Sequence, residues 1–186
     1  MSALTVYPDH QPGAGEFFTE FSDIQARLSG IGVQFERWTA HCELAENADQ
    51  DAVITAYRDS VDRLMRQYGF EAVDVISLQP DHPQKAAFRE KFLAEHTHDD
   101  FEVRFFVDGR GLFYLHVGAK VYAVLCEKGD LISVPAHATH WFDMGENPRF
   151  KCIRLFTTPE GWVASFTGSD IARSFPTFDQ YVAGLS

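Results

Sequence analysis

Cysteine and positive charge are both scarce in this chain, and each scarcity excludes a class of function. The three cysteines, Cys42, Cys126 and Cys152, are scattered, and no CxxC or CxxH pair occurs. This usage argues against a disulfide framework or a thiolate zinc site, so we expect buried, inert thiols. The 16 basic residues face 27 acidic ones, which gives a net charge of −11. A surface of this sign disfavours nucleic acids and anionic membranes, so we expect a small-molecule partner.

Long apolar runs, flexible linkers and internal repeats are also missing. The sequence has no run of about eighteen apolar residues to span a bilayer, and its first residues lead into no apolar signal segment. We therefore expect a cytoplasmic location and no membrane partner. Because nothing in the sequence resembles a long exposed edge strand or a coiled coil, we also expect a monomer. At 186 residues the chain is long enough to bury about 70 % of the surface that its unfolded form exposes. A single domain spanning residues 1–186 is the simplest organisation.

The second half of the chain is rich in aromatic and β-forming residues. From Phe101 onward, short β-forming segments alternate with Gly, Asp and Pro turns. These segments are 101–107, 112–117, 120–126, 130–135, 140–142 and 151–157. Such spacing is typical of an antiparallel sandwich or barrel. We expect a mainly β fold with its barrel core at about 72–158, and an aromatic, loop-like tail at 159–186 that wraps around the barrel.

Helical patterns are concentrated in the N-terminal part, residues 1–71. A capping box at Ser22 predicts a short helix that ends at Gly30. A second capping pattern at Asn47 opens an amphipathic helix that runs to Gly69. A third, shorter helix is predicted at 84–92. Strands are predicted around residues 4–6, 32–38 and 73–78.

Four residues stand out as a metal-binding set, namely His96, His98, Glu102 and His140. Side chains on a strand alternate between its two faces, so the even numbers of the first three place them on one face. His140 belongs to a later strand, and a metal would tie the two segments together. Three imidazole nitrogens and one carboxylate suit Fe(II), Ni(II), Mn(II), Co(II) or Zn(II). An octahedral ion would keep two adjacent positions free for a chelating substrate, which favours a catalytic site.

Arg104 follows Glu102 by two positions, so its guanidinium is expected on the same inner face. A buried arginine costs free energy unless it meets an anion. One interpretation is a structural ion pair with a carboxylate such as Asp130 or Asp143. The other is a charge clamp on an anionic substrate. A divalent ion with Glu102 carries one net positive charge, so a dianionic chelate would leave a negative charge for Arg104 to balance.

Two further residues near the ligands have competing interpretations. Phe142 shares the parity of His140, whereas Trp141 does not, so Phe142 is better placed to wall a pocket. A plain core position fits its parity equally well. Glu95 precedes His96, where it would either accept a hydrogen bond that orients an imidazole or lie on the surface as a solvated carboxylate.

The spacing of these residues resembles the two motifs of the cupin superfamily. Residues 96–109, with HTHxxxE and a closing Gly, match the first motif, and residues 129–140, with Gly, Pro and a closing His, match the second. Glu90 stands where the first motif usually opens with Gly, and His137 replaces a Gly two residues after the proline. These departures affect the loops and not the ligands. The resemblance implies a cupin-type antiparallel β-barrel (jelly roll) with a few N-terminal α-helices packed outside.

Within the cupins, nearly the whole chain is similar to the acireductone dioxygenases of methionine salvage. The segment FxxEHTHxDxEVRFFVxGxGxF, residues 92–113, is specific to that family. The resemblance implies one Fe(II) or Ni(II) per chain, held by the four residues above, with acireductone and O2 as substrates. It implies formate and 2-keto-4-methylthiobutyrate as products of the iron form. For the nickel form it implies formate, methylthiopropionate and carbon monoxide.

The same resemblance implies roles for further residues. Arg104 would help to generate and hold the substrate dianion. Glu95 occupies the family position linked to metal incorporation, and Phe101 the position linked to conformational change around the site. Phe142 and Trp162 occupy positions where aromatic walls shape the path of the substrate.

Two other functions use the same set of ligands. A cupin isomerase, or a dioxygenase acting on a sugar or a diketone, would bind its metal in the same way, and an isomerase would turn over without O2. A non-catalytic cupin would bind a small molecule and consume no O2 with any acireductone.

Overall fold

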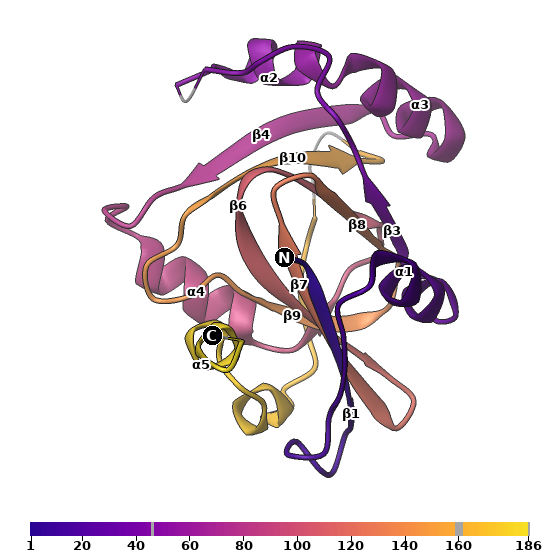
Figure 1. Ribbon diagram of the computed structural model, residues 1–186, viewed down its shortest axis with the longest axis vertical. Coiled ribbons are helices and arrows are strands. Elements are labelled where there is room, and N and C mark those ends of the chain that lie inside the picture. Colours follow the sequence, from indigo (N-terminus) through magenta and orange to yellow (C-terminus); the bar gives the residue numbers. More distant parts are fainter. Residues whose placement is uncertain (46, 159–161, 186) are drawn as a thin grey trace.

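An antiparallel β-barrel dominates the computed structural model, which describes residues 1–45, 47–158 and 162–185 (Figure 1). The strands are β1 (Ala3–Pro8), β2 (Glu16–Phe18), β3 (Gln34–Arg37), β4 (Ala72–Leu78), β5 (His96–Thr97), β6 (Glu102–Val117), β7 (Lys120–Glu127), β8 (Asp130–Val134), β9 (Thr139–Asp143), β10 (Phe150–Phe156) and β11 (Ser165–Phe166). One sheet has the order β11-β5-β9-β6-β7-β1-β2. The other runs β4-β10-β6-β8-β3 and shares β6 with the first. The expectation of a mainly β fold is confirmed.

The shared strand β6 differs from the prediction of two strands at 101–107 and 112–117. Gly109 lies at the junction with φ of +72°, and an added Cβ there would collide with the backbone of Arg149. The half before Gly109 pairs with β8 and β10, and the half after it pairs with β7 and β9. Gly109 therefore bends one continuous strand from the second sheet into the first, instead of making the predicted turn.

The bend also reverses which side chains of β6 face inwards. Before it, the even-numbered Phe106 faces the barrel interior, and after it the odd-numbered Phe113 and Leu115 do so. The odd-numbered Phe105 lies on one outer face and the even-numbered Tyr114 on the other. Alternation within each half thus supplies three hydrophobic layers, one inside the barrel and one on each outer face.

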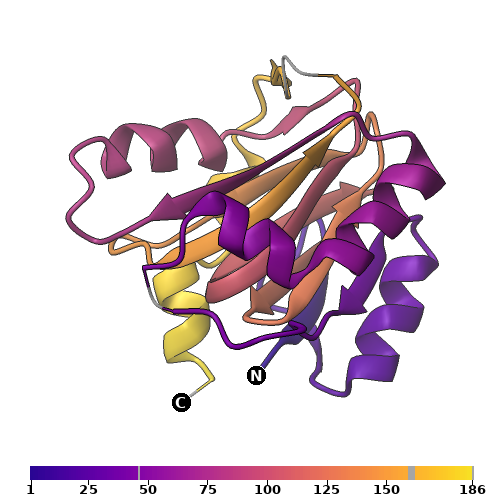
Figure 2. The same ribbon diagram turned by 90° about the horizontal axis from the view of Figure 1, so that it is seen from above.

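Helices α2 (Gln50–Ala56) and α3 (Arg58–Tyr68) follow one another over the outer face of β4 and β10 (Figures 1 and 2). The sequence predicts a single helix from Asn47 to Gly69, but this helix is interrupted at Tyr57. The carbonyl of Ala56 accepts a hydrogen bond from the amide of His41, 2.9 Å away, instead of continuing the helical ladder. This contact outside the helix is invisible to local periodicity.

The ends of the helices follow the prediction more closely than their caps do. Gly69 ends α3 at φ +71°, as its position indicates. Helix α1 (Phe21–Ser29) begins after Glu20 without a side-chain cap, so the capping box at Ser22 is wrong. The side chain of Asp49, rather than that of Asn47, accepts the capping hydrogen bond of α2. Helix α4 (Lys85–Leu93) matches the helix predicted at 84–92.

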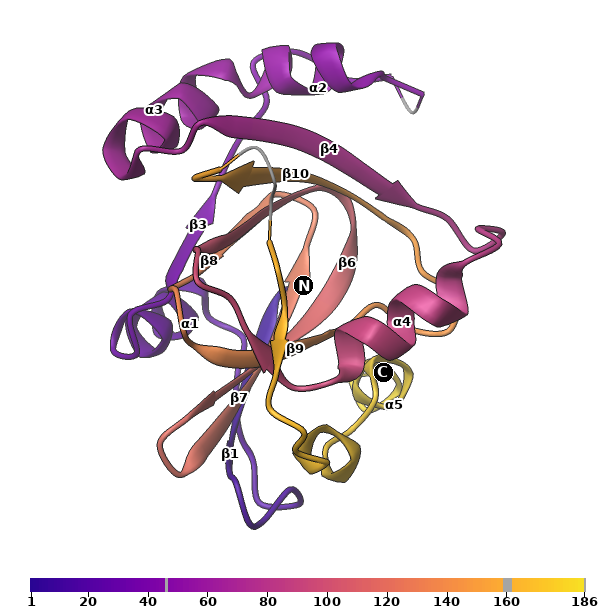
Figure 3. The ribbon, with the colours of Figure 1, turned by 180° about the vertical axis from the view of Figure 1, so that it is seen from behind.

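The expected tail begins at 159, and residues 159–161 lie outside the described residues. From Trp162 the tail contains β11, a 3-10 helix (Ile171–Ser174) and α5 (Phe178–Ala183), so it is more regular than expected. Phe175 and Tyr181 pack with Tyr114 and Trp141 on the outer face of the first sheet. Figure 3 shows the segment after Trp162 running across the barrel towards α4 and α5.

Two of the three thiols are buried, as predicted, and the third is not. Cys126 and Cys152 lie in the barrel core, where burial raises the pKa of Cys152 to about 12. Cys42 is exposed, because it lies in the irregular segment that follows β3. Within the described residues, no helix combines the length and the apolar character needed to cross a membrane.

Candidate metal centre

The four predicted ligands meet inside the barrel. His96 begins β5, His98 follows it, Glu102 begins β6 and His140 lies in β9. Their ligand atoms all lie within 4.8 Å of one another. Antiparallel pairing of β5 with β9 sets His96 directly opposite His140. All four side chains are buried, so an ion held by them would be shielded from bulk water.

Each imidazole is oriented by a backbone carbonyl. The contacts run from His96 Nδ1 to Ala94 O at 2.6 Å, from His98 Nδ1 to Val163 O at 3.0 Å, and from His140 Nδ1 to Ala138 O at 2.8 Å. Because a carbonyl oxygen only accepts, Nδ1 must carry the proton, and the lone pair of each ring then resides on Nε2. The Nε2 atoms of His98 and His140 lie 3.0 and 2.9 Å from Oε2 of Glu102. The rings therefore present the tautomer that a metal ligand needs.

The electrostatics of the site favour an ionised Glu102 and a neutral His96. Burial by itself would raise the pKa of Glu102, but the charge of Arg104 and the contacts with His140 outweigh it and hold that pKa well below its usual value. Burial, together with the nearby His140, lowers the pKa of His96 to about 4. Converging lone pairs and a carboxylate repel one another unless a cation lies among them. Three nitrogens and one oxygen in this state fit a divalent first-row metal.

His137 shows how the chain tolerates the loss of a motif glycine. Its φ is +64°, the left-handed region that glycine occupies without cost. Its backbone N–H donates to the carbonyl of His98 over 2.8 Å, while its side chain is exposed. The loop therefore keeps the conformation that a glycine would take, and the departure does not disturb the ligands.

A pocket of about 370 Å³ opens beside the ligands. Phe142 and Trp162 line it, at the positions where the sequence predicts aromatic walls. Sequence reasoning missed the contribution of α4, whose Phe88 and Phe92 also line the pocket. These two residues are four positions apart on one helix face, so helical periodicity would have paired them. The remaining wall residues that were missed are Asp74, Ile76, Lys91, Arg154, Phe156 and Ala164.

Arg104 lies in this pocket and is 4 % exposed. Its Nε is 2.8 Å from Oε1 of Glu102, which makes a close ion pair. The N–H is not aligned with that oxygen, however, and neither Nε nor Nη1 has a hydrogen-bond acceptor among the described residues. Buried donors in this state are rare, because each costs free energy until an acceptor arrives.

Aromatic rings surround the guanidinium of Arg104. Its Cζ lies 4.6 Å from the ring centre of Phe142, 5.4 Å from that of Trp162, and 5.5 Å from those of Phe92 and Phe113. Such rings attract the positive charge with their faces but accept no ordinary hydrogen bond. They fix the position of the group while leaving its N–H donors for another acceptor.

The carboxylates considered as structural partners of Arg104 are engaged elsewhere. Asp130 accepts from Arg37 over 3.1 Å, and Asp143 accepts from Arg89 over 2.8 and 3.1 Å. The interpretation that pairs Arg104 with either of them is wrong. Parity gave the correct face for Arg104, but it does not indicate which arginine forms an ion pair with which carboxylate.

Glu95 is buried, so its interpretation as a solvated surface carboxylate is wrong. Its side chain accepts from Thr167 Oγ1 over 2.7 Å and contacts Nδ1 of His116 at 3.0 Å. The reversal of parity at Gly109 explains the position of His116 on the outer face of β6. The carboxylate of Glu95 therefore joins the start of β5 to the segment after β11, and a backbone carbonyl, not this carboxylate, orients the ring of His96.

Phe101 lies outside the pocket. Its ring packs in the layer beneath α2 and α3, 5.9 Å from the ring of Tyr68. Its carbonyl accepts a hydrogen bond from Nε1 of Trp162 over 2.8 Å. The backbone carbonyl of Phe101 thus holds the indole of Trp162, which lines the pocket.

Known proteins resemble this chain over almost its whole length. The ARD/ARD′ family matches residues 7–164. An acireductone dioxygenase of Methylococcus capsulatus is 59 % identical over 98 % of both chains. Another, from Aquifex aeolicus, is 54 % identical over 99 % of this chain and 100 % of its own. An acireductone dioxygenase from Bacillus anthracis with a cadmium ion in its active centre has a TM-score of 0.78 at 27 % identity, over 89 % of this chain and 98 % of that one.

An antiparallel barrel that gathers three histidines and a glutamate from β5 and the residue after it, from β6 and from β9 defines a metal-binding cupin, and the barrel of the solved structure agrees. The cupin-type fold predicted from the motifs is confirmed. The chain belongs to the ARD/ARD′ family and is a dioxygenase enzyme. The cadmium in the solved relative occupies that protein's active centre, which agrees with a metal site here without naming the ion.

Proposed function

We propose that the enzyme cleaves acireductone, 1,2-dihydroxy-3-keto-5-methylthiopentene, with O2 in methionine salvage. The names of the relatives support this substrate. One Fe(II) or Ni(II) per chain would be held by His96, His98, Glu102 and His140. The proposal includes a monomeric enzyme that works in the cytoplasm.

The observation that carries the proposal is the state of Arg104. Its guanidinium is buried beside the metal ligands, with two nitrogens that lack an acceptor among the described residues. A purely structural arginine would satisfy these donors within the protein. Donors left free in a pocket instead prepare it for an anionic ligand, because the cost of desolvating them is already met in folding.

Charge balance agrees with an enediolate ligand. A divalent ion with Glu102 carries one net positive charge, and a dianionic substrate would turn that into one net negative charge. Arg104 then restores neutrality in a buried site, where an unbalanced charge is costly. A neutral sugar would leave the charge of Arg104 unused, so an acidic, chelating substrate fits better.

The residues of the pocket define how the substrate would lie. The N–H donors of Arg104 would bind and orient its anionic oxygens. The apolar side chains of Ile76, Phe88 and Phe92 suit the methylthio tail. The indole of Trp162, held by the carbonyl of Phe101, covers the site and keeps water from the reacting atoms.

In this proposal, the identity of the metal determines which products form. When bound, the ion supplies a Lewis-acidic centre with open positions, and we propose that it selects formate and 2-keto-4-methylthiobutyrate with Fe(II), or formate, methylthiopropionate and carbon monoxide with Ni(II). The protein residues described above are the same in both cases.

The test is O2 consumption by the full chain reconstituted separately with Fe(II) and Ni(II), with metal content verified. The expected result is uptake of O2 with acireductone, keto acid from the iron preparation, and carbon monoxide in the headspace of the nickel preparation. His98→Ala serves as the control, since it should lose both metal and turnover. Identical products from the two preparations would overturn metal-selected cleavage. No O2 uptake by either would overturn the proposed function.

A further inference from the structure

A second arginine, Arg154, shares the pocket with Arg104. Strand β10 lies between β4 and β6, and Arg154 is the register partner of Asp74 on one side and of Arg104 on the other. Directly opposed residues of an antiparallel pair lie on the same face, with Cβ atoms about 5 Å apart. Asp74, Arg154 and Arg104 therefore form a row across three strands on the pocket side of the sheet.

The row runs from the mouth of the pocket to its floor. The side chain of Asp74 is 38 % exposed, that of Arg154 25 % and that of Arg104 4 %. The indole of Trp162 contacts both cations, with its ring centre 5.6 Å from Cζ of Arg154 and 5.4 Å from Cζ of Arg104. The two guanidinium groups thus border the same ring, one near the solvent and one beside the metal ligands.

Arg154 is held in a fixed orientation by Asp74. Its Nε donates to one carboxylate oxygen over 2.8 Å and its Nη2 to the other over 2.6 Å. A guanidinium has five N–H donors, and this contact uses one edge of the group. The like charges of Arg154 and Arg104 face each other across the strand pair, which is unfavourable until an anion lies between them.

The charge of the whole protein makes such a cation useful. A net charge of −11 repels an anionic substrate from the surface at large. The pocket is locally different, since Lys91, Arg104 and Arg154 line it against the carboxylates of Asp74 and Glu102. A cleft of local positive charge raises the concentration of an anion at its mouth and speeds association.

We propose that Arg154 is a second substrate-binding residue, which binds the anionic acireductone at the mouth of the pocket before Arg104 binds it beside the metal. The inference rests on the proposed function and extends it. A purely structural role, in which Arg154 and Asp74 only pair two strands, predicts a different response to substitution.

The experiment compares Arg154→Gln, Arg154→Lys and Asp74→Asn in the metal-loaded enzyme. Arg154→Gln should raise KM about tenfold and keep kcat within about twofold, because the lost cation acts on association. Arg154→Lys should recover part of the loss. Asp74→Asn should leave KM unchanged or lower it, since it removes a competing negative charge but keeps an acceptor oxygen for Arg154. Arg63→Gln, which breaks the Arg63–Glu36 pair on the outer surface, is the matched control for net charge.

Two readouts separate this role from a structural one. The salt dependence of kcat/KM should become shallower in Arg154→Gln and stay unchanged in Arg63→Gln. Calorimetric titration of acireductone without O2 should give a Kd that weakens in parallel with KM. Unchanged KM and Kd in Arg154→Gln, or an equal loss in Asp74→Asn, would overturn the inference. If Arg154→Gln failed to fold, the response of Asp74→Asn would still decide. A wild-type enzyme with no turnover of acireductone would instead refute the proposed function.

Discussion

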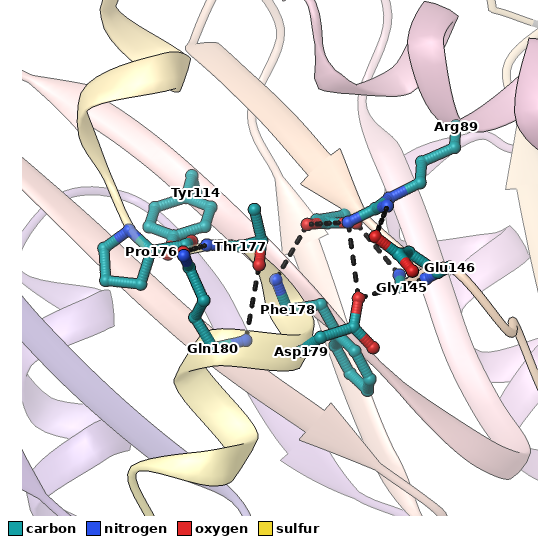
Figure 4. A network of polar contacts seen from close by, with 10 residues as sticks. Arg89, Tyr114, Gly145, Glu146, Pro176, Thr177, Phe178, Asp179 and Gln180 are labelled. Carbon is teal, nitrogen blue, oxygen red and sulfur yellow. Dashed lines mark hydrogen bonds and ion pairs between the residues drawn. The ribbon is translucent and has the colours of Figure 1, made fainter.

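Two arginines with little exposed surface have opposite surroundings: the side chain of Arg89 is 17 % exposed and that of Arg104 is 4 % exposed. Arg89, on α4, contacts the carboxylates of Asp143 and Asp179. Arg104, on β6, instead has donors without acceptors among the described residues. Figure 4 shows Arg89 at the centre of contacts that reach α5 and the turn after β9. The difference shows that the state of the donors, rather than burial itself, separates a structural arginine from one prepared for a ligand.

In the network around Arg89, the guanidinium is paired with carboxylates that are themselves hydrogen-bonded. Asp143 accepts two hydrogen bonds from Arg89 and two more from the backbone N–H groups of Gly145 and Phe178. Asp179 of α5 contacts the same guanidinium at 3.4 Å. The hydrogen bond with Asp143 raises the pKa of Arg89. This network fastens α4, which forms one wall of the pocket, to β9, which carries the ligand His140.

Replacing Arg104 is expected to have the largest effect on activity. Arg104→Met keeps the volume of the side chain and removes its charge, so turnover should fall by about two to four orders of magnitude. The metal should stay bound. The free energy of unfolding of the metal-loaded protein should change by less than about 1 kcal/mol, because the charge of the metal replaces the cation lost beside Glu102 and the two donors without an acceptor are removed. O2 uptake, metal content and urea unfolding measure the three quantities.

Arg104→Lys is the companion variant. It keeps the positive charge but loses the planar guanidinium and its paired N–H donors, so it should recover only part of the turnover. Near-normal turnover of Arg104→Met with metal bound would contradict the account. A large loss of stability in that variant would place Arg104 in the same class as Arg89.

Replacing Arg89 should affect stability instead. Arg89→Met leaves the buried carboxylate of Asp143 without its cation, so the free energy of unfolding should fall by about 3 kcal/mol. The fraction that remains folded should turn over within about threefold of the wild type, because Arg89 does not line the pocket. Urea unfolding measures the free energy of unfolding. Turnover divided by the amount of bound metal measures the activity of the folded fraction. A variant of normal stability but poor turnover would reverse the assignment of the two arginines.

The smallest expected effect lies at the edge of the Arg89 network. Thr177 and Gln180 form a capping box at the start of α5. Thr177→Ala should lower the free energy of unfolding by about 1 kcal/mol and leave KM and kcat unchanged. Thr177→Ser is the control, since it retains the hydroxyl. A change of KM in the alanine variant would show that α5 and the pocket are coupled.

The ligands and most strands were predictable because they follow local rules. Alternation fixes which residues of a strand share a face, and the motif spacing then identifies His96, His98 and Glu102 as one group. The bend at Gly109 was not predictable, since a glycine in the left-handed region suits a turn and a bent strand equally. The break at Tyr57 depends on the amide of His41, which sequence periodicity does not include.

The polar partners in the site were the hardest to predict. Parity identified Arg104 as an inward residue, but which carboxylate it meets depends on three strands and a helix. Arg154 carried a usable signal, because a charged residue flanked by apolar Cys152 and Phe156 on the same face stands out within its strand. Its pairing with Asp74 required the register of β4 against β10.

The most direct test of the contrast is a calorimetric titration of acireductone, without O2, into the metal-loaded wild type, Arg104→Met and Arg89→Met. If the free donors of Arg104 exist to bind the substrate anion, Kd should weaken about tenfold to a hundredfold in Arg104→Met, the range expected for lost hydrogen bonds to a charged group. Arg89→Met should bind as the wild type does. Equal affinity in the wild type and Arg104→Met would contradict the account.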